Sequence, residues 1–222
     1  MSDQTLPDAP PDFPKGAFSF ALAGPAGTLE VLTHAPEGTQ LDVVALICHP
    51  HPQHGGTMHN KVVTIIERSL SELGIKTVRF NFRGVGQSNG AFAEGIGETE
   101  DLFAVLAWVQ RVLPAQELIL AGFSFGSFVA LRAAQLLKLK QLISVAPPVE
   151  RYAYQELKRP SCPWLVVQGE TDEVVDADAV FRWAESVTPA LTLVRMPDTG
   201  HFFHRKLMDL RGVIKNSVKR LL

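Results

Sequence analysis

Hydrophobic residues follow two alternating patterns along most of this chain. Short runs rich in β-branched residues are followed by longer segments in which apolar residues recur at helical spacing. This alternation is typical of a parallel sheet covered on both faces by helices. Strands are expected at residues 41–50, 76–84, 116–124, 139–148, 162–170 and 191–198.

The segments between these strands have helix signals at their ends. Residues 60–74 have one apolar face and end at Gly74, which suits a left-handed cap. Thr99 is expected to cap the next helix, and Pro114 follows its end. Further helices are expected at residues 124–138, 176–187 and 205–222.

The N-terminal region has a different pattern. Residues 16–24 and 27–35 predict an antiparallel pair of strands, and the acidic, proline-rich residues 1–16 predict a flexible leader without signal-peptide features. No apolar run approaches the roughly 18 residues that a membrane span needs. We therefore expect a single domain at 17–222, located in the cytoplasm, with no membrane partner.

Composition and charge narrow the function classes. Hydrophobic residues make up 46% and charged residues 20% of the chain, and the net charge is −2, so the sequence is that of a globular protein without a nucleic-acid partner. Lys215, Lys219 and Arg220 gather in the last helix, where they favour its dipole. Cys48 and Cys162 do not suggest a disulfide framework and fit a reducing compartment.

The pattern Gly-x-Ser-x-Gly occurs twice, at residues 86–90 and 122–126. A nucleophilic serine in this motif lies on a tight turn from a strand into a helix. Only the second copy lies directly between a strand-like and a helix-like run, whereas the first leads into a glycine-rich loop. Ser124 is therefore the predicted nucleophile, and Ser88 is predicted to be a loop residue.

A serine hydroxyl needs a histidine to accept its proton and a carboxylate to orient that histidine. Asp172 and His201 each follow a later apolar strand directly, in the chain order serine, acid, histidine. Glu170 and Asp176 are alternatives for the acid. His204 lies further along, at the start of the last predicted helix. We therefore expect Ser124, Asp172 and His201 to form a catalytic triad.

With these residues in place, the chain from about residue 17 to its end resembles the serine α/β-hydrolase superfamily. It is similar to small bacterial members related to the dienelactone-hydrolase-like and serine-aminopeptidase-like branches, whose signature H-P-H-P-x-x-G-G-T-M-x-N-K-V-V matches residues 49–63. The group's Arg-Gly-x-Gly-x-Ser loop matches at Arg83 and Ser88, which implies a structural turn there. Ser124 replaces the cysteine of dienelactone hydrolase proper and the aspartate of dehalogenases.

This resemblance implies the α/β-hydrolase fold, a doubly wound, mostly parallel sheet with an antiparallel N-terminal strand. A cap domain often follows the strand after the nucleophile helix in this superfamily. Here only residues 148–160 lie between that strand and the next, which is too short for several packed helices. We therefore expect an α/β-hydrolase without a cap domain.

The loop after the third strand supplies an oxyanion-hole donor in this fold. One donor is expected to be the backbone N–H of Phe125, directly after the nucleophile. Prolines have no N–H, so Pro50 and Pro52 are excluded. His51 is the favoured second donor, and Gly55 and Gly56 are the alternative.

Four of the seven histidines fall within residues 48–60. A metal site needs three or four converging ligands, and neither the interleaved prolines nor the cysteine spacing favours one. We therefore expect no metal. His54 and His59 are candidates for substrate contact or ordinary loop residues, and Gly55 and Gly56 are further candidates for substrate or loop contacts.

The predicted function is that of a serine hydrolase acting through an acyl-enzyme, with an open site, a small-molecule acyl substrate and no cofactor. An ester or thioester substrate is favoured. Alternatives are a peptidase or amidase of the same fold, a catalytically silent binding protein, and a metal-dependent hydrolase using the histidine loop. The sequence does not indicate the leaving group or the oligomeric state.

Overall fold

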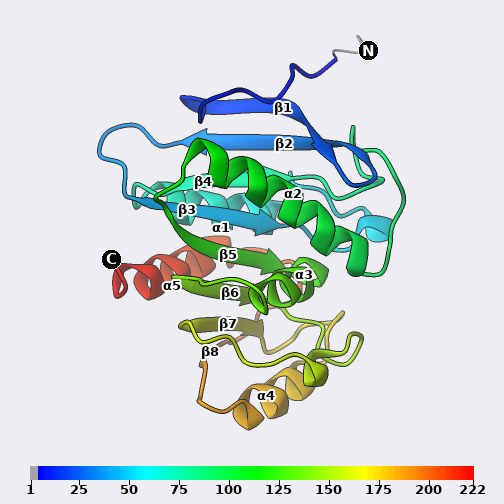
Figure 1. The fold of residues 1–222 in the computed structure, drawn as a ribbon. Coiled ribbons are helices and arrows are strands. Elements are labelled where there is room, and N and C mark those ends of the chain that lie inside the picture. Colours follow the sequence, from blue (N-terminus) through cyan, green and yellow to red (C-terminus); the bar gives the residue numbers. More distant parts are fainter. Residues whose placement is uncertain (1–4) are drawn as a thin grey trace.

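In the computed structural model, residues 5–222 form an eight-stranded sheet flanked by five α-helices (Figure 1). The strand order is β1-β2-β4-β3-β5-β6-β7-β8. β2 pairs antiparallel with both β1 and β4, and all other neighbours are parallel. This confirms the predicted α/β-hydrolase fold with an antiparallel strand near the N-terminus.

The elements lie close to the predicted segments. The strands are β1 (Gly16–Gly24), β2 (Gly27–Ala35), β3 (Val43–Cys48), β4 (Lys76–Phe80), β5 (Glu117–Phe123), β6 (Gln141–Val145), β7 (Trp164–Gly169) and β8 (Thr192–Met196). The helices are α1 (Lys61–Ser71), α2 (Ile96–Val112), α3 (Phe125–Ala134), α4 (Ala177–Ser186) and α5 (Leu207–Lys219), with the 3-10 turns η1 (Pro52–His54) and η2 (Tyr154–Glu156). Within residues 5–222, no helix is long and apolar enough to cross a membrane.

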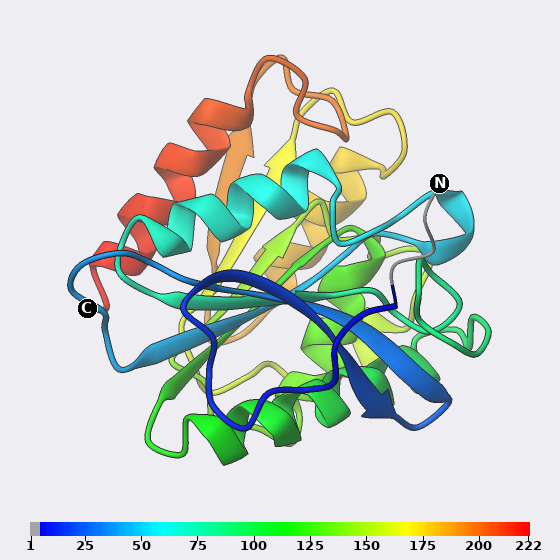
Figure 2. The same ribbon diagram turned by 90° about the horizontal axis from the view of Figure 1, so that it is seen from above.

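Two hydrophobic cores lie on opposite faces of the sheet. Figure 2 shows α1 and α5 over one face and α2 and α3 over the other. Alternate residues of β3 supply the two cores: Val44, Leu46 and Cys48 face α2 and α3, whereas Val43, Ala45 and Ile47 face α1 and α5. Because both faces are covered, the central strands are apolar throughout, as the sequence pattern indicates.

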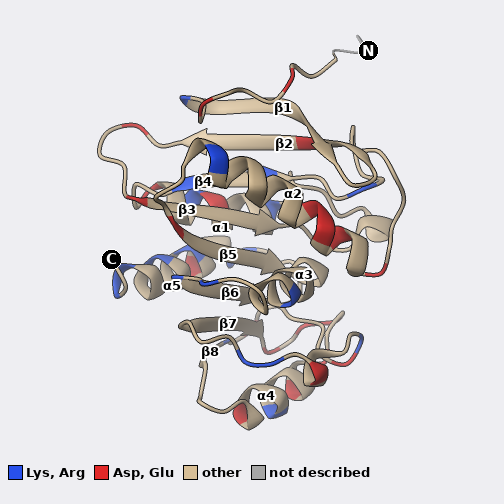
Figure 3. Ribbon diagram, viewed as in Figure 1, with Lys and Arg blue, Asp and Glu red and all other residues tan. Residues whose placement is uncertain are grey.

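The basic residues near the C-terminal end of α5 (Figure 3) have a partner besides the helix dipole. Lys215 Nζ lies 2.7 Å from Glu72 Oε2, at the end of α1, and Arg211 binds the same carboxylate. These contacts lower the pKa of Glu72 through hydrogen bonds and charge. Lys215, from this basic cluster, and Arg211 therefore join α5 to α1.

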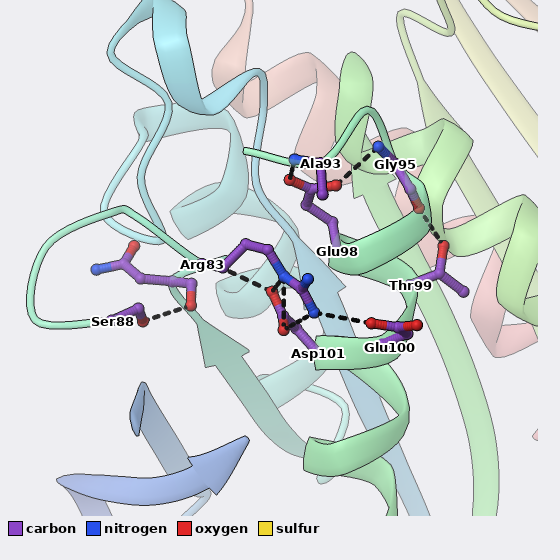
Figure 4. Close-up of polar contacts among 9 residues, drawn as sticks. Arg83, Ser88, Ala93, Gly95, Glu98, Thr99, Glu100 and Asp101 are labelled. Atoms are coloured by element: carbon purple, nitrogen blue, oxygen red, sulfur yellow. Dashed lines mark hydrogen bonds and ion pairs between the residues drawn. The ribbon is translucent and has the colours of Figure 1, made fainter. Parts of the chain in front are cut away.

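The start of α2 differs from the prediction that Thr99 caps it. The helix begins at Ile96, and the carboxylate of Glu98 accepts hydrogen bonds from Ala93 N and Gly95 N at 2.8 and 2.7 Å (Figure 4). Thr99 Oγ1 instead donates to Gly95 O. The Thr99 prediction is wrong because the fully buried Glu98 satisfies the free N–H groups at this end.

The segment before β1 is also more ordered than a flexible leader. Ala21 N donates to Pro7 O at 2.8 Å, and Trp108 Nε1 on α2 donates to Pro10 O at 3.1 Å. The ring of Phe13 lies 5.9 Å from that of Trp108. Residues 7–13 therefore pack on β1 and α2, because their carbonyls and apolar side chains find partners there; residues 1–4 of the predicted leader lie outside the described residues.

No lid covers the carboxyl ends of the strands. Residues 146–163, which connect β6 to β7 and are all described, contain only the single turn η2. The carboxyl ends of β5, β7 and β8 therefore stay accessible, and these ends carry the predicted site residues.

Candidate active site

Ser124 lies on a sharp turn between β5 and α3. Its backbone has φ 52° and ψ −123°, in the left-handed half of conformational space that non-glycine residues rarely adopt. Ser124 N donates to Val145 O on β6 at 2.8 Å, and Ser124 O accepts from Ser127 N and Ser127 Oγ at 2.8 and 2.6 Å. These bonds hold the turn in a conformation that costs about 1–3 kcal/mol by itself.

The two glycines of this motif are required by close packing. A Cβ at position 122 would lie 2.2 Å from Gly126 O, and one at position 126 would lie 2.4 Å from Cys48 O. Real side chains do not tolerate either distance. The glycines therefore let the turn close and bring α3 against the end of β3.

His201 connects the serine to an acid. Its Nε2 lies 3.2 Å from Ser124 Oγ, and its Nδ1 lies 2.8 Å from Asp172 Oδ2. The His201 side chain is 3% exposed and that of Asp172 is completely buried. The loops after β5, β7 and β8 thus bring the three residues predicted from sequence into one hydrogen-bonded chain, in which Nδ1–H donates to the carboxylate and Nε2 faces the hydroxyl.

The carboxylate of Asp172 is held as an anion. Its Oδ1 accepts from Val174 N and Val175 N, both at 2.8 Å, and its Oδ2 also accepts from Gln168 Nε2 at 3.0 Å. Burial raises the pKa of Asp172, but the hydrogen bond and charge of His201 and the two backbone donors outweigh burial and leave the pKa below its ordinary value. Asp172 can therefore orient and stabilise a protonated His201.

The alternative residues for acid and base lie elsewhere. Asp176 caps α4 by accepting from Asp178 N and Ala179 N. Glu170 and His204 are exposed and have no hydrogen bond to Ser124 or His201 within the described chain. Geometry therefore singles out Asp172 and His201.

Ser88, in the other Gly-x-Ser-x-Gly copy, is bound to backbone (Figure 4). Its Oγ donates to Asn81 O at 2.7 Å and accepts from Glu30 N at 2.9 Å. Nearby, the buried guanidinium of Arg83 pairs with the fully buried Asp101, with Nη2 to Oδ1 at 2.8 Å, and with the more exposed Glu100 at 3.1 Å. This loop has the structural role that the resemblance implies.

The histidines at 49 and 51 have different environments. His49 is fully buried: its Nδ1 donates to Pro50 O at 2.7 Å and its Nε2 accepts from Phe82 N at 3.0 Å. Burial lowers the pKa of His49 to about 3, against a smaller raising effect of the Pro50 carbonyl. His49 is therefore a neutral clamp between the ends of β3 and β4, whereas His51 is half-exposed and contacts the rings of Phe92 and Phe125.

Some backbone N–H groups near Ser124 already donate a hydrogen bond within the protein, and others do not. In the described chain, neither Phe125 N nor His51 N has a hydrogen-bond partner, while Gly56 N donates to His51 O at 3.0 Å. A Cβ at position 56 would lie 2.1 Å from Pro50 O, so this glycine is needed for the tight loop itself. Of the predicted second donors, His51 and Gly55 retain a free N–H and Gly56 does not.

A pocket of about 360 Å³ opens above Ser124. Most of its walls are apolar, and no acidic side chain lines it. The lining residues are Pro50, His51, His54, Gly55, Gly56, Asn60, Ser124, Phe125, Pro148, Arg151, Tyr152, Val174, His201 and Phe202. Among the predicted contact residues, His54, Gly55 and Gly56 line the pocket, whereas His59 is exposed outside it.

The histidine loop does not gather metal ligands. Both ring nitrogens of His49 are bonded within the protein, and over residues 5–222 no three His, Cys, Asp or Glu side chains converge as a metal site would require. The imidazoles therefore have separate structural and pocket positions.

Sequence reasoning missed several residues around the site. Gln168 supports Asp172, Ser127 holds the carbonyl of Ser124, and Arg151 and Tyr152 line the pocket. Ser127 lies about one helical turn after Ser124, so helical spacing places it beneath Ser124. No local pattern marks Arg151, because it lies in an irregular connection whose path depends on tertiary contacts.

Comparison with known proteins agrees with this geometry. Residues 46–216 match a family model described as an alpha/beta hydrolase domain. The chain is 36% identical over 203 residues to an uncharacterized protein of Rickettsia prowazekii, covering 87% of this chain and 85% of that protein.

Solved structures are similar along nearly the whole chain. A serine hydrolase without a lid from Xanthomonas campestris is 51% identical, with a TM-score of 0.92, covering 96% of this chain and 98% of that one. A serine hydrolase homologue from Coxiella burnetii is 47% identical, with a TM-score of 0.87, covering 89% of this chain and 95% of that one. The chain belongs to the α/β-hydrolase family, as a serine hydrolase that lacks a lid.

Proposed function

We propose that the protein hydrolyses an ester or thioester of a small-molecule acyl group through an acyl-enzyme on Ser124. The observation that carries this proposal is the hydrogen-bonded chain from Ser124 Oγ through His201 to Asp172, which faces an apolar pocket. Such a chain supplies the base that a serine hydroxyl needs to become a nucleophile.

The proposed reaction has two halves. Ser124 Oγ attacks the substrate carbonyl while its proton moves to His201 Nε2, and the protonated histidine then gives this proton to the leaving alcohol or thiol. Water attacks the acyl-enzyme by the reverse exchange, with His201 again as the base. The buried, ionised Asp172 stabilises the positive charge on His201 in both halves.

Two backbone donors support stabilisation of the tetrahedral intermediate. Phe125 N lies at the start of α3, where the helix dipole adds to its hydrogen bond, and His51 N is free after the end of β3. Each such donor contributes about 3–4 kcal/mol to the transition state. His49, bound at both ring nitrogens, supports the position of the adjacent His51 loop.

The open pocket favours activated acyl compounds over long free chains. Without a lid, the site cannot enclose a long aliphatic chain, and its apolar walls accommodate a short or aromatic group. A thiol or alcohol leaving group departs more readily than an amine, so an amidase or peptidase activity is the second candidate.

Covalent labelling with a fluorophosphonate probe tests the proposal. We expect one adduct on wild-type Ser124 and none on Ser124→Ala, with Ser88→Ala as the matched control that labels like wild type. Absence of labelling in wild type, or equal labelling of Ser124→Ala, would contradict it. Activity that survives metal chelation would also remove the metal-dependent alternative.

A further inference from the structure

The pocket above Ser124 is lined by basic side chains and by no acidic side chain. Its basic lining side chains, apart from His201, are His51, His54 and Arg151. The guanidinium of Arg151 carries a permanent positive charge, and no carboxylate among the lining residues of this pocket balances it. An electrostatic site of this kind favours negatively charged ligands.

Arg151 is oriented but not neutralised. Its Nη2 donates to Val174 O at 2.7 Å, next to Asp172, and its backbone N donates to Pro148 O at 3.1 Å. Within residues 5–222 no carboxylate oxygen lies within 4 Å of its guanidinium, although Glu150 and Asp176 line the neighbouring depression with it. The remaining guanidinium N–H groups are therefore available to a ligand, in a fork that matches a carboxylate or phosphate.

The field of Arg151 reaches other residues of the pocket. Burial lowers the pKa of His51, and the charges of His54 and then Arg151 lower it further. Burial raises the pKa of Tyr152; the charge of Arg151 opposes this rise, and the charges of Glu98 and Glu94 add to it. An anion bound in this pocket would therefore lie within the electrostatic reach of Arg151.

An aromatic surface adjoins the guanidinium. The Tyr152 ring stacks on Phe128 at 4.7 Å and lies 5.4 Å from Phe125, the residue that follows the nucleophile. Phe125 and Phe128 are buried, so the pocket surface of this aromatic wall is mainly the Tyr152 ring, which the packing holds rigid at little entropic cost.

We propose that the substrates are esters or thioesters that carry a negatively charged group, which Arg151 binds while the aromatic wall contacts the uncharged part. This inference rests on the proposed function and adds its substrate class. The shared chemistry is an oxyanion, either a carboxylate in the acyl part or a phosphate in the leaving group.

Two matched substrate pairs separate these sources. The p-nitrophenyl monoester of adipate, with a free carboxylate, is compared with its neutral methyl ester, and butyryl-coenzyme A is compared with butyryl-N-acetylcysteamine. The measured quantity is the ratio of kcat/KM between the charged and neutral members, after subtraction of the uncatalysed rate. It is determined for wild type, Arg151→Gln, Arg151→Lys and Arg111→Gln.

We expect a preference for the charged member in at least one pair. Arg151→Gln should lower that ratio about tenfold, since it removes a charge-assisted hydrogen bond at an exposed position. Arg151→Lys should retain part of it by charge alone. Arg111, exposed on α2, makes the same charge change outside the pocket and should leave the ratio unchanged.

The proposal is overturned if Arg151→Gln changes both members of both pairs by the same factor, or if Arg111→Gln lowers the ratio equally. Failure of the proposed function looks different. In that case wild type hydrolyses none of the four compounds, or Ser124→Ala hydrolyses them as fast as wild type does.

Discussion

The two Gly-x-Ser-x-Gly segments share a five-residue pattern and hold their serines in opposite ways. Both lone-pair and proton directions of Ser88 Oγ are bound to backbone, at Glu30 N and Asn81 O. Ser124 has its backbone atoms bound instead, at Val145 O and Ser127, while its Oγ faces His201 Nε2 at 3.2 Å.

This difference separates a structural serine from the proposed nucleophile. A hydroxyl that satisfies two backbone groups stabilises the fold and cannot give up its proton without leaving them unpaired. When the backbone atoms of a serine make all of its structural hydrogen bonds, its hydroxyl is free to react. The distinction therefore lies in which atoms of the serine are bonded, not in the motif.

Exchanging each serine for alanine gives the largest contrast. Ser124→Ala should lower kcat by roughly 10⁴- to 10⁶-fold because it removes the proposed nucleophile, with little change in the free energy of unfolding. Ser88→Ala should retain kcat and lower that free energy by about 1–3 kcal/mol, because Glu30 N and Asn81 O lose their partner. Ester hydrolysis and urea unfolding measure both quantities, and the reverse assignment would contradict the comparison.

A smaller effect is expected from the ion pair beside Ser88. Asp101→Asn removes the buried negative charge beside Arg83 and leaves the exposed Glu100 as the remaining carboxylate of the pair, and should lower the free energy of unfolding by about 3 kcal/mol. Glu100→Gln removes a solvated partner and should cost less than about 1 kcal/mol. Equal losses in the two variants, measured by urea unfolding, would show that burial of Asp101 does not matter.

A pH-dependent effect is expected from His49, which joins the two regions. Its Nε2 accepts from Phe82 N at the base of the Ser88 loop, and its carbonyl packs against Gly126 in the Ser124 turn. The folded pKa of about 3 lies below the unfolded value near ~6.5, so the unfolded chain binds the proton first. This contribution to stability is complete above pH ~6.5 and is lost as pH falls toward 3, by about 2 kcal/mol at pH 5.

Unfolding measured at pH 7 and pH 5 tests this slope. His49→Gln should reduce the difference between the free energies of unfolding at pH 7 and pH 5. His59→Gln, at an exposed position on the same loop, should leave that difference unchanged. Nitrogen NMR of the wild-type protein should show a neutral His49 ring with its proton on Nδ1 at both pH 7 and pH 5. If the His49 ring becomes charged by pH 5, the interpretation of His49 as a neutral clamp is contradicted.

Sequence reasoning succeeded where the signal is local and failed where partners come from distant segments. Strands that are apolar on both faces and helices with one apolar stripe predict the layers, and strand ends predict where Ser124, Asp172 and His201 lie. Thr99 has the right side chain for a cap, but Glu98 reaches the free N–H groups instead. The packing of residues 7–13 depends on Trp108, about a hundred positions along the chain, which no local pattern shows.

The sequence by itself determined the succession of strands and helices along the chain. It also determined which serine has a strand directly before it and a helix directly after it, and it excluded the prolines as hydrogen-bond donors. These follow from periodicity, from turn chemistry and from the missing N–H of proline. Only the tertiary structure decided that Gly56 N is already bonded, that His49 and His51 have different environments, and that Arg151 stands without a carboxylate in the pocket. Each of these depends on which groups from separate loops come within hydrogen-bond distance, and that is a property of packing rather than of any local stretch of residues.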